Sequence, residues 1–163
     1  KAGSKLDPEK AEEYAFVDAY FPIYFNGLRL YSGDYTSSVD HKEVPNMNLR
    51  LAATAGHGIA LIVSAILDPA ALQATGEAQP VLSEQEILRR IAERYANGAL
   101  PGVRQVTVHQ LALEYVPMTR DVSASKGYDL YPAWVARMTW ETDTQETITT
   151  YDAYHAVTGE RLF

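Results

Sequence analysis

At 163 residues, the chain is long enough for one domain or for two small units that share a core. Its formal net charge of −7 argues against nucleic acid and anionic membranes as partners, because both need a basic surface. With no cysteine, the sequence excludes disulfides and thiolate metal sites. Its longest apolar run, residues 59–67, is too short to span a membrane.

The N-terminal part of the chain predicts an aromatic hairpin. Asp7 followed by Pro8 is typical of a helix start, so a short helix is expected over residues 8–14. Further on, Asn26-Gly27 predicts a two-residue turn, because both turn positions need positive φ. Pro22 predicts a sheet edge or a bulge close to this hairpin.

Two further strands are expected before residue 68. Residues 47–53 alternate between apolar and other side chains, which predicts a half-buried strand. Residues 59–67 are apolar on both parities, which is typical of a central strand covered on both faces. Residues 68–82 contain two prolines and a glycine and are interpreted as a linker between two halves.

The clearest element is a helix over residues 84–96. Ser83 and Glu86 form a capping box, in which each side chain accepts from the other residue's backbone N–H. Apolar residues then recur at helical spacing, and Asn97-Gly98 supplies a left-handed stop.

Three strand-like runs follow this helix. Residues 103–116 change parity near His109, which predicts a bulge. Residues 128–140 alternate regularly, and Pro132 predicts that this strand is an edge at that point. Residues 147–156 are rich in Thr and Tyr. The expected fold class is therefore α+β, with helices packed on an antiparallel sheet. Its two related units would cover residues 1–67 and 83–163, or share one core.

Two stretches carry a resemblance to known families. Residues 151–162, which read YDAYHAVTGERL, look like the closing strand of PepSY-type domains, although His155 replaces the usual acidic or amide residue. Residues 14–30, which read YAFVDAYFPIYFNGLRL, resemble the aromatic strand of YycH/YycI-type extracytoplasmic proteins. The whole is also similar to uncharacterised secreted lipoproteins of Gram-positive gut bacteria. The resemblance implies two related PepSY/YycI-like units and a regulatory role outside the membrane. It also implies a secreted or lipid-anchored protein of a Gram-positive bacterium that binds an envelope protein.

Aromatic side chains are the candidate binding residues. They could line a groove for a peptide or sugar, or they could pack the helix against the sheet. The candidates are Tyr20, Tyr24, Tyr31, Tyr128, Tyr131 and Trp134. An exposed strand edge could also accept a strand from a partner.

No residue set points to catalysis. The four histidines lack metal-ligand spacing, so no metal or cofactor is predicted. The stretch Gly56-His57-Gly58 is interpreted as a turn and Ser83 as a cap. Asp18 is expected to pair with Arg29 across the hairpin turn.

Three functions therefore remain open. The first is a non-catalytic extracytoplasmic module that binds an envelope protein through a sheet edge or an aromatic face. The second is a small-ligand or peptide-binding protein with an aromatic groove between the two units. The third is a hydrolase, which the missing motifs make least favoured.

Overall fold

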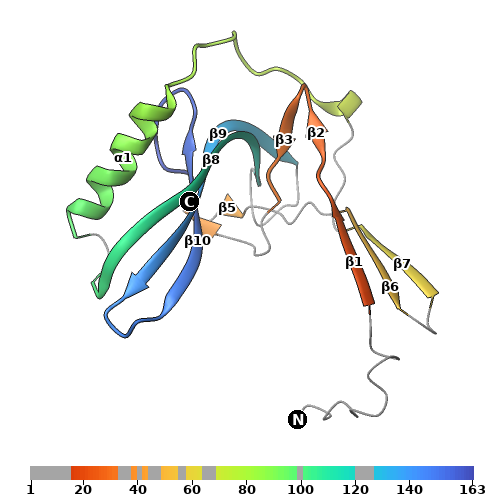
Figure 1. The fold of residues 1–163 in the computed structure, drawn as a ribbon. Coiled ribbons are helices and arrows are strands. Elements are labelled where there is room, and N and C mark those ends of the chain that lie inside the picture. The colour runs from red at the N-terminus through yellow and green to blue at the C-terminus, as the bar shows by residue number, and fades with distance from the viewer. Residues whose placement is uncertain are drawn as a thin grey trace, which may run out of the picture.

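A five-stranded sheet forms the main body of the molecule (Figure 1). The computed structural model describes residues 16–32, 38–39, 42–43, 49–54, 58–63, 69–98, 101–119 and 127–163. The strand order in this sheet is β10-β9-β8-β3-β2. Its members are β2 (Tyr24–Phe25), β3 (Leu28–Leu30), β8 (Val103–Thr119), β9 (Tyr128–Thr142) and β10 (Thr147–His155).

Two smaller sheets are built from the first half of the chain. The three-stranded sheet has the order β1-β6-β7, with β1 (Phe16–Phe21), β6 (Leu49–Thr54) and β7 (Gly58–Val63). A two-stranded ladder joins β4 (Ser38–Val39) to β5 (Lys42–Glu43), and β5 lies against β8. A 3₁₀ turn, η2 (Pro69–Ala71), comes before the helix.

The expected α+β fold class is wrong, because strands far outweigh helix in the structure. The described residues are mostly strand and include one α-helix, so the fold is not a pair of units with helices packed on antiparallel sheets. The main sheet is also mixed, because β3 pairs with β8 in parallel while the other ladders are antiparallel. The physical reason is that the Asn26-Gly27 hairpin adds its own strands to the sheet of the second half. The expected helix over residues 8–14 lies outside the described residues.

The predicted helix is confirmed as α1 (Glu84–Ala96). The Ser83 hydroxyl accepts from the Glu86 backbone N–H at 3.3 Å, which satisfies one of the unpaired N–H groups of the first turn. Ile87 and Ile91 are its buried residues. The hairpin turn is confirmed as well, with φ of 47° at Asn26 and 80° at Gly27. So is the bulge, which falls between Val108 and Gln110.

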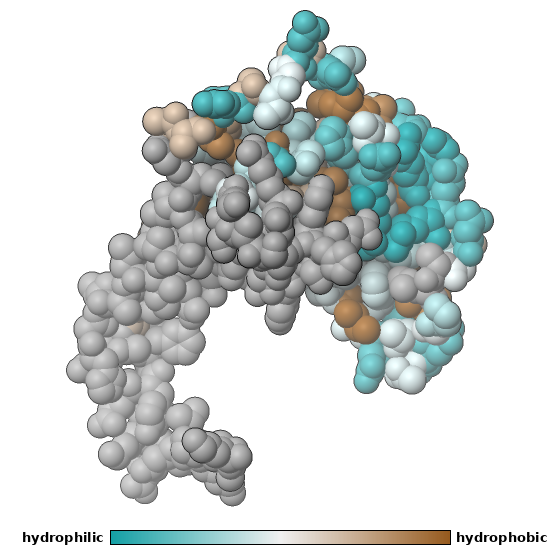
Figure 2. All heavy atoms as spheres, turned by 180° about the vertical axis from the view of Figure 1, so that it is seen from behind, coloured by the Kyte–Doolittle hydropathy of each residue, from teal (hydrophilic) through white to brown (hydrophobic). Residues whose placement is uncertain are grey.

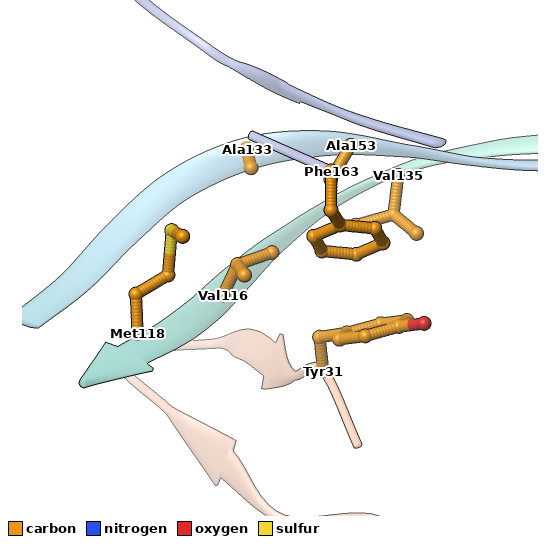
Figure 3. Packing of buried hydrophobic residues seen from close by; sticks show 7 residues of the cluster. All are labelled: Tyr31, Val116, Met118, Ala133, Val135, Ala153 and Phe163. Carbon is orange, nitrogen blue, oxygen red and sulfur yellow. The ribbon is translucent and has the colours of Figure 1, made fainter. Parts of the chain in front are cut away.

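The main sheet has a core on each face. On one face, α1 covers side chains from the three long strands, among them Trp134, Met138 and Tyr154. On the other face, Tyr31 and Phe163 close over residues such as Val116, as Figure 3 shows. Side chains alternate between the faces along a strand, so neighbouring residues of β9 serve different cores.

β9 lies between β10 and β8, but its ladder with β10 stops at Ala133, so among the described strands it pairs at Pro132 with β8 alone, as predicted. The Pro132 carbonyl accepts from the Ala156 backbone N–H at 2.7 Å, but a proline has no N–H to give to the Ala156 carbonyl in return. The Leu82 N–H donates to that carbonyl instead, at 2.7 Å. The Trp134 indole N–H donates to the Leu82 carbonyl at 2.9 Å. Both backbone groups of Leu82 are thus held where α1 begins.

One other expectation fails. β7 covers the apolar run from residue 59, and within the described residues it pairs only with β6, so it is an edge strand rather than a central one. Arg29 forms an ion pair with Glu114 at 3.7 Å. The expected pairing of Arg29 with Asp18 concerns a side chain that lies outside the described ones. Residues 55–57, predicted as a turn, lie outside the described residues.

Candidate functional site

The six aromatic residues expected to form one groove lie in different surroundings. Trp134 is buried on the α1 face, whereas Tyr31 belongs to the opposite core and Tyr131 packs against it. The Tyr131 ring contacts His155. Tyr24 is 63% exposed on the edge strand β2. Tyr128 is half-buried at the start of β9, and Tyr20 belongs to β1 in the smaller sheet. The structure therefore does not bring the other five side chains together in one site, and the Tyr20 side chain lies outside the described ones.

A groove of about 350 Å³ lies instead between α1 and the first half of β8. The helix contributes Leu88, Ile91, Ala92 and Tyr95 to its walls, and the strand contributes Val103, Val106 and Val108. Arg104 and Gln105 supply polar groups, and Gly98 closes the end of the helix wall. A mainly apolar groove with few polar groups is the usual form of a binding site.

Helix geometry explains why this flank of α1 is apolar. At about 100° per residue, Leu88, Ala92 and Tyr95 fall on one side of the buried Ile87 and Ile91. The opposite flank carries charges: Arg90 donates to Glu86 at 2.9 Å and to the Gly159 carbonyl at 3.1 Å. Arg89 also bonds Glu86, and these two arginines lower the pKa of Glu86 to about 2. One flank is thus tied to the rest of the molecule, and the other borders the groove.

The outer edge of β8 runs beside this groove. Among the described residues, strand pairing on that side is with β3 alone, at Glu114 and Tyr115. The Tyr31 N–H extends the β3–β8 pairing by donating to the Tyr115 carbonyl. Within the described part of the chain, the edge from Val103 to Leu113 therefore has no strand paired with it. Leu88, on the helix wall of the groove, is 42% exposed, so the helix side of this region is also partly open.

The register shows which backbone groups face outward along this edge. The Pro132 carbonyl points toward β10. The backbone N–H and C=O groups of the even-numbered residues of β9 therefore point toward β10, and those of the odd-numbered residues point toward β8. Thr107 is opposite Thr139 and therefore bonds inward. Val106 and Val108 consequently direct their N–H and C=O groups outward, while their side chains belong to the α1 face.

Tyr95 belongs to the helix wall of the groove and joins this wall to a buried carboxylate. Its hydroxyl donates to Asp152 Oδ2 at 2.9 Å, and Tyr154 donates to the same atom at 3.2 Å. Arg161 donates to Asp152 Oδ1 at 3.0 Å, and Arg94 lies 3.8 Å from Oδ2. Burial, followed by the nearby Asp152 charge, raises the pKa of both tyrosines. These hydroxyls therefore stay protonated donors, which suits a structural network.

The sequence could have indicated part of this site. Leu88 lies outside the narrow stripe of Ile87 and Ile91, which is a sign of a second apolar surface on the helix. The open edge of β8 could not be foreseen, because it depends on where the distant strand β3 pairs. Among the described residues, no group of His, Asp and Glu is placed to hold a metal ion.

Within the described ranges, none of the helices has the length and apolar character needed to cross a membrane. No protein-family model, curated protein or solved structure matches this chain.

Proposed function

We propose that this chain is a non-catalytic interaction module that binds an extended segment of an envelope protein. The segment would add as a strand to the outer edge of β8 and place alternate side chains in the groove beside α1. The observation that carries the proposal is the coincidence of two features at one place. The edge from Val103 to Leu113 has no strand partner among the described residues, and the apolar groove lies directly beside it.

The backbone geometry supports this mode of binding. Val106 and Val108 direct both of their hydrogen-bonding groups outward, so an added strand would find a ladder with the spacing of an ordinary sheet. Residues of the added strand opposite these valines would direct their side chains to the α1 face. Leu88, Ala92 and Tyr95 would then form the far wall against which they pack. The main chain would supply affinity, and the groove would select apolar side chains.

The described residues on one face of the molecule form no large flat apolar patch. Seen from behind, the described part is mainly hydrophilic, with separate small apolar areas (Figure 2). Large exposed apolar patches are typical of flat protein interfaces, so this face does not support that mode. The envelope setting of the proposal rests on the resemblance of residues 14–30 and 151–162 to extracytoplasmic domains.

The test begins with a random linear peptide library displayed on phage and selected on the purified chain. We expect extended, apolar peptides to be enriched. Leu88→Lys should weaken a selected peptide's binding by about tenfold or more, because a charge would stand in the groove wall. Ile148→Lys is the matched control, because Ile148 is equally exposed, at 44%, but lies on β10. Equal binding by the parent and both variants would contradict the proposal.

A second experiment addresses the partner itself. The parent and Leu88→Lys would each be used as bait in a cell-envelope extract. The proposal predicts an envelope protein recovered by the parent and lost with the variant. Recovery of the same proteins by both baits would contradict binding through the groove.

A further inference from the structure

The opposite edge of the main sheet suggests a second interaction surface. β10 forms this edge, and part of it is covered by the end of the described chain. The Ala153 N–H donates to the Phe163 carbonyl at 3.2 Å, and the Leu162 N–H donates to the Ala153 carbonyl at 2.7 Å. His155 likewise donates its N–H to the Glu160 carbonyl at 2.7 Å. Residues 160–163 thus act as a short covering strand over the second half of β10.

The first half of β10 has no such cover within the described residues. From Thr147 to Tyr151 the strand pairs with β9 on its inner side only. The backbone N–H and C=O groups of Ala153 point away from β9. Backbone groups alternate in direction along a strand, so those of Thr147, Thr149 and Tyr151 point away from β9 too. Each of these residues therefore presents an N–H and a C=O at the sheet edge.

This open segment lacks the features by which proteins usually block an edge. Exposed edges are commonly protected by charged residues, proline or a bulge. The segment reads TITTY, has no charged residue or proline, and pairs with β9 without a register shift. It also carries two large apolar residues that are well exposed, Ile148 at 44% and Tyr151 at 40%.

We propose that this edge pairs with the same edge of a second copy of the chain, forming an antiparallel dimer about a twofold axis at Thr149. In this register Thr149 faces its own copy, and Thr147 faces Tyr151 of the second molecule. All outward backbone groups of the segment then form hydrogen-bonded pairs. A twofold interface needs a surface that is complementary to itself, and this segment meets that condition.

The second copy fits the length of the open edge. β10 begins at Thr147, after a turn closed by the bond from the Thr142 N–H to the Glu146 carbonyl. The second copy's strand therefore turns away at the point where residues 160–163 begin to cover the edge. Segments 147–151 of the two copies carry no ionisable group except the Tyr151 phenol, so the paired segments themselves set no charged groups opposite one another.

Side chains would also be complementary on both faces of the joined sheet. On the α1 face, Ile148 lies next to Trp140 of β9 and would cover Thr150 of the second copy. On the other face, Tyr151 lies next to Arg137 and contacts the Tyr31 ring, and it would pack against Thr147 of the second copy. Tyrosine and threonine are favourable cross-strand partners in antiparallel sheets.

Analytical ultracentrifugation over a range of concentrations tests this dimer. The parent mass should rise from 18.1 kDa toward twice that value and no further. Thr149→Pro removes the central outward N–H, and Ile148→Lys adds a charge at the edge, so both should remain monomeric at concentrations where the parent dimerises. Leu88→Lys, which changes the groove beside β8 and not the β10 edge, should dimerise as the parent does.

A parent that stays monomeric throughout, or that grows beyond a dimer, would overturn the proposal. So would dimerisation of Ile148→Lys equal to that of the parent. Hydrogen exchange on the parent provides a test that needs no variant. Slower exchange at the Thr147, Thr149 and Tyr151 amides is expected at high concentration, with Thr150 unchanged because it already bonds to β9. Exchange independent of concentration at these amides would also overturn it. This test is separate from peptide binding at β8.

Discussion

The Tyr95 hydroxyl donates a 2.9 Å hydrogen bond to Asp152, which joins the wall of the groove to the sheet edge strand β10. Asp152 is only 1% exposed, and Arg94 and Arg161 lie beside it as compensating charges. A buried carboxylate is costly unless it is paired and hydrogen-bonded. This arrangement therefore fixes how α1 sits over the sheet, and with it the width of the groove.

Asp152→Asn should destabilise the protein by about 3 kcal/mol, because it leaves two arginines beside a neutral group. Asp143→Asn makes the same chemical change at an exposed turn and should have little effect. Chemical denaturation of both variants measures the difference. Similar stabilities for the two would show that the Asp152 network does not hold the helix in place.

Trp134→Phe tests the attachment of the helix start. The change keeps an aromatic ring in the core but removes the indole N–H that donates to the Leu82 carbonyl. The loss of one buried hydrogen bond should cost about 1 to 2 kcal/mol. Hydrogen exchange should also become faster in the first turn of α1. Unchanged exchange there would contradict the role assigned to this bond.

Gly159 has a positive φ of 72°, and a Cβ there would lie 2.5 Å from Arg90 Cζ. Gly159→Ala therefore strains the backbone and also moves Arg90 away from the Gly159 carbonyl. Gly98→Ala is the matched control, because Gly98 has φ of 74° but open space around it. The Gly159 variant should be less stable than this control by about 1 kcal/mol. In an Arg90→Ala background this difference should disappear, which a double-mutant cycle would measure.

Glu114 predicts a specific pH dependence. Burial raises the pKa of its carboxyl above the usual 4.5, although the nearby Arg29 opposes the shift. The neutral form is thus favoured in the folded state, and its stabilising contribution is lost as pH rises through the raised pKa. Glu114→Gln should match the parent at about pH 4 and exceed it in stability at about pH 7. Urea titrations at both values test the sign, and a variant less stable at neutral pH would contradict it.

Local signals in the sequence predicted the local structure well. Ser83, Glu86 and Gly98 act within a few residues of themselves, so the helix and its cap could be placed correctly. Turn chemistry at Asn26-Gly27 and the parity change near His109 were equally readable, because each depends on neighbouring backbone geometry.

Long-range pairing could not be read in the same way. Pro132 marks the end of the β9–β10 ladder, as its missing N–H predicts, but the sequence does not show that the Leu82 N–H donates to the Ala156 carbonyl there. The parallel pairing of β3 with β8 has no sequence pattern of its own, and it determines both the fold class and the open edge. The six aromatic candidates do not form one group, because alternation along β9 sends Tyr131 and Trp134 to opposite faces.

Hydrogen exchange at β8 tests the proposed function most directly. The exchange of individual backbone amides would be measured with and without a peptide selected from the display library. Strand addition predicts slower exchange at Val106 and Val108, with Thr107 unchanged because its amide already bonds to β9. Protection confined to other parts of the molecule, or none at these valines while the peptide is bound, would contradict the account.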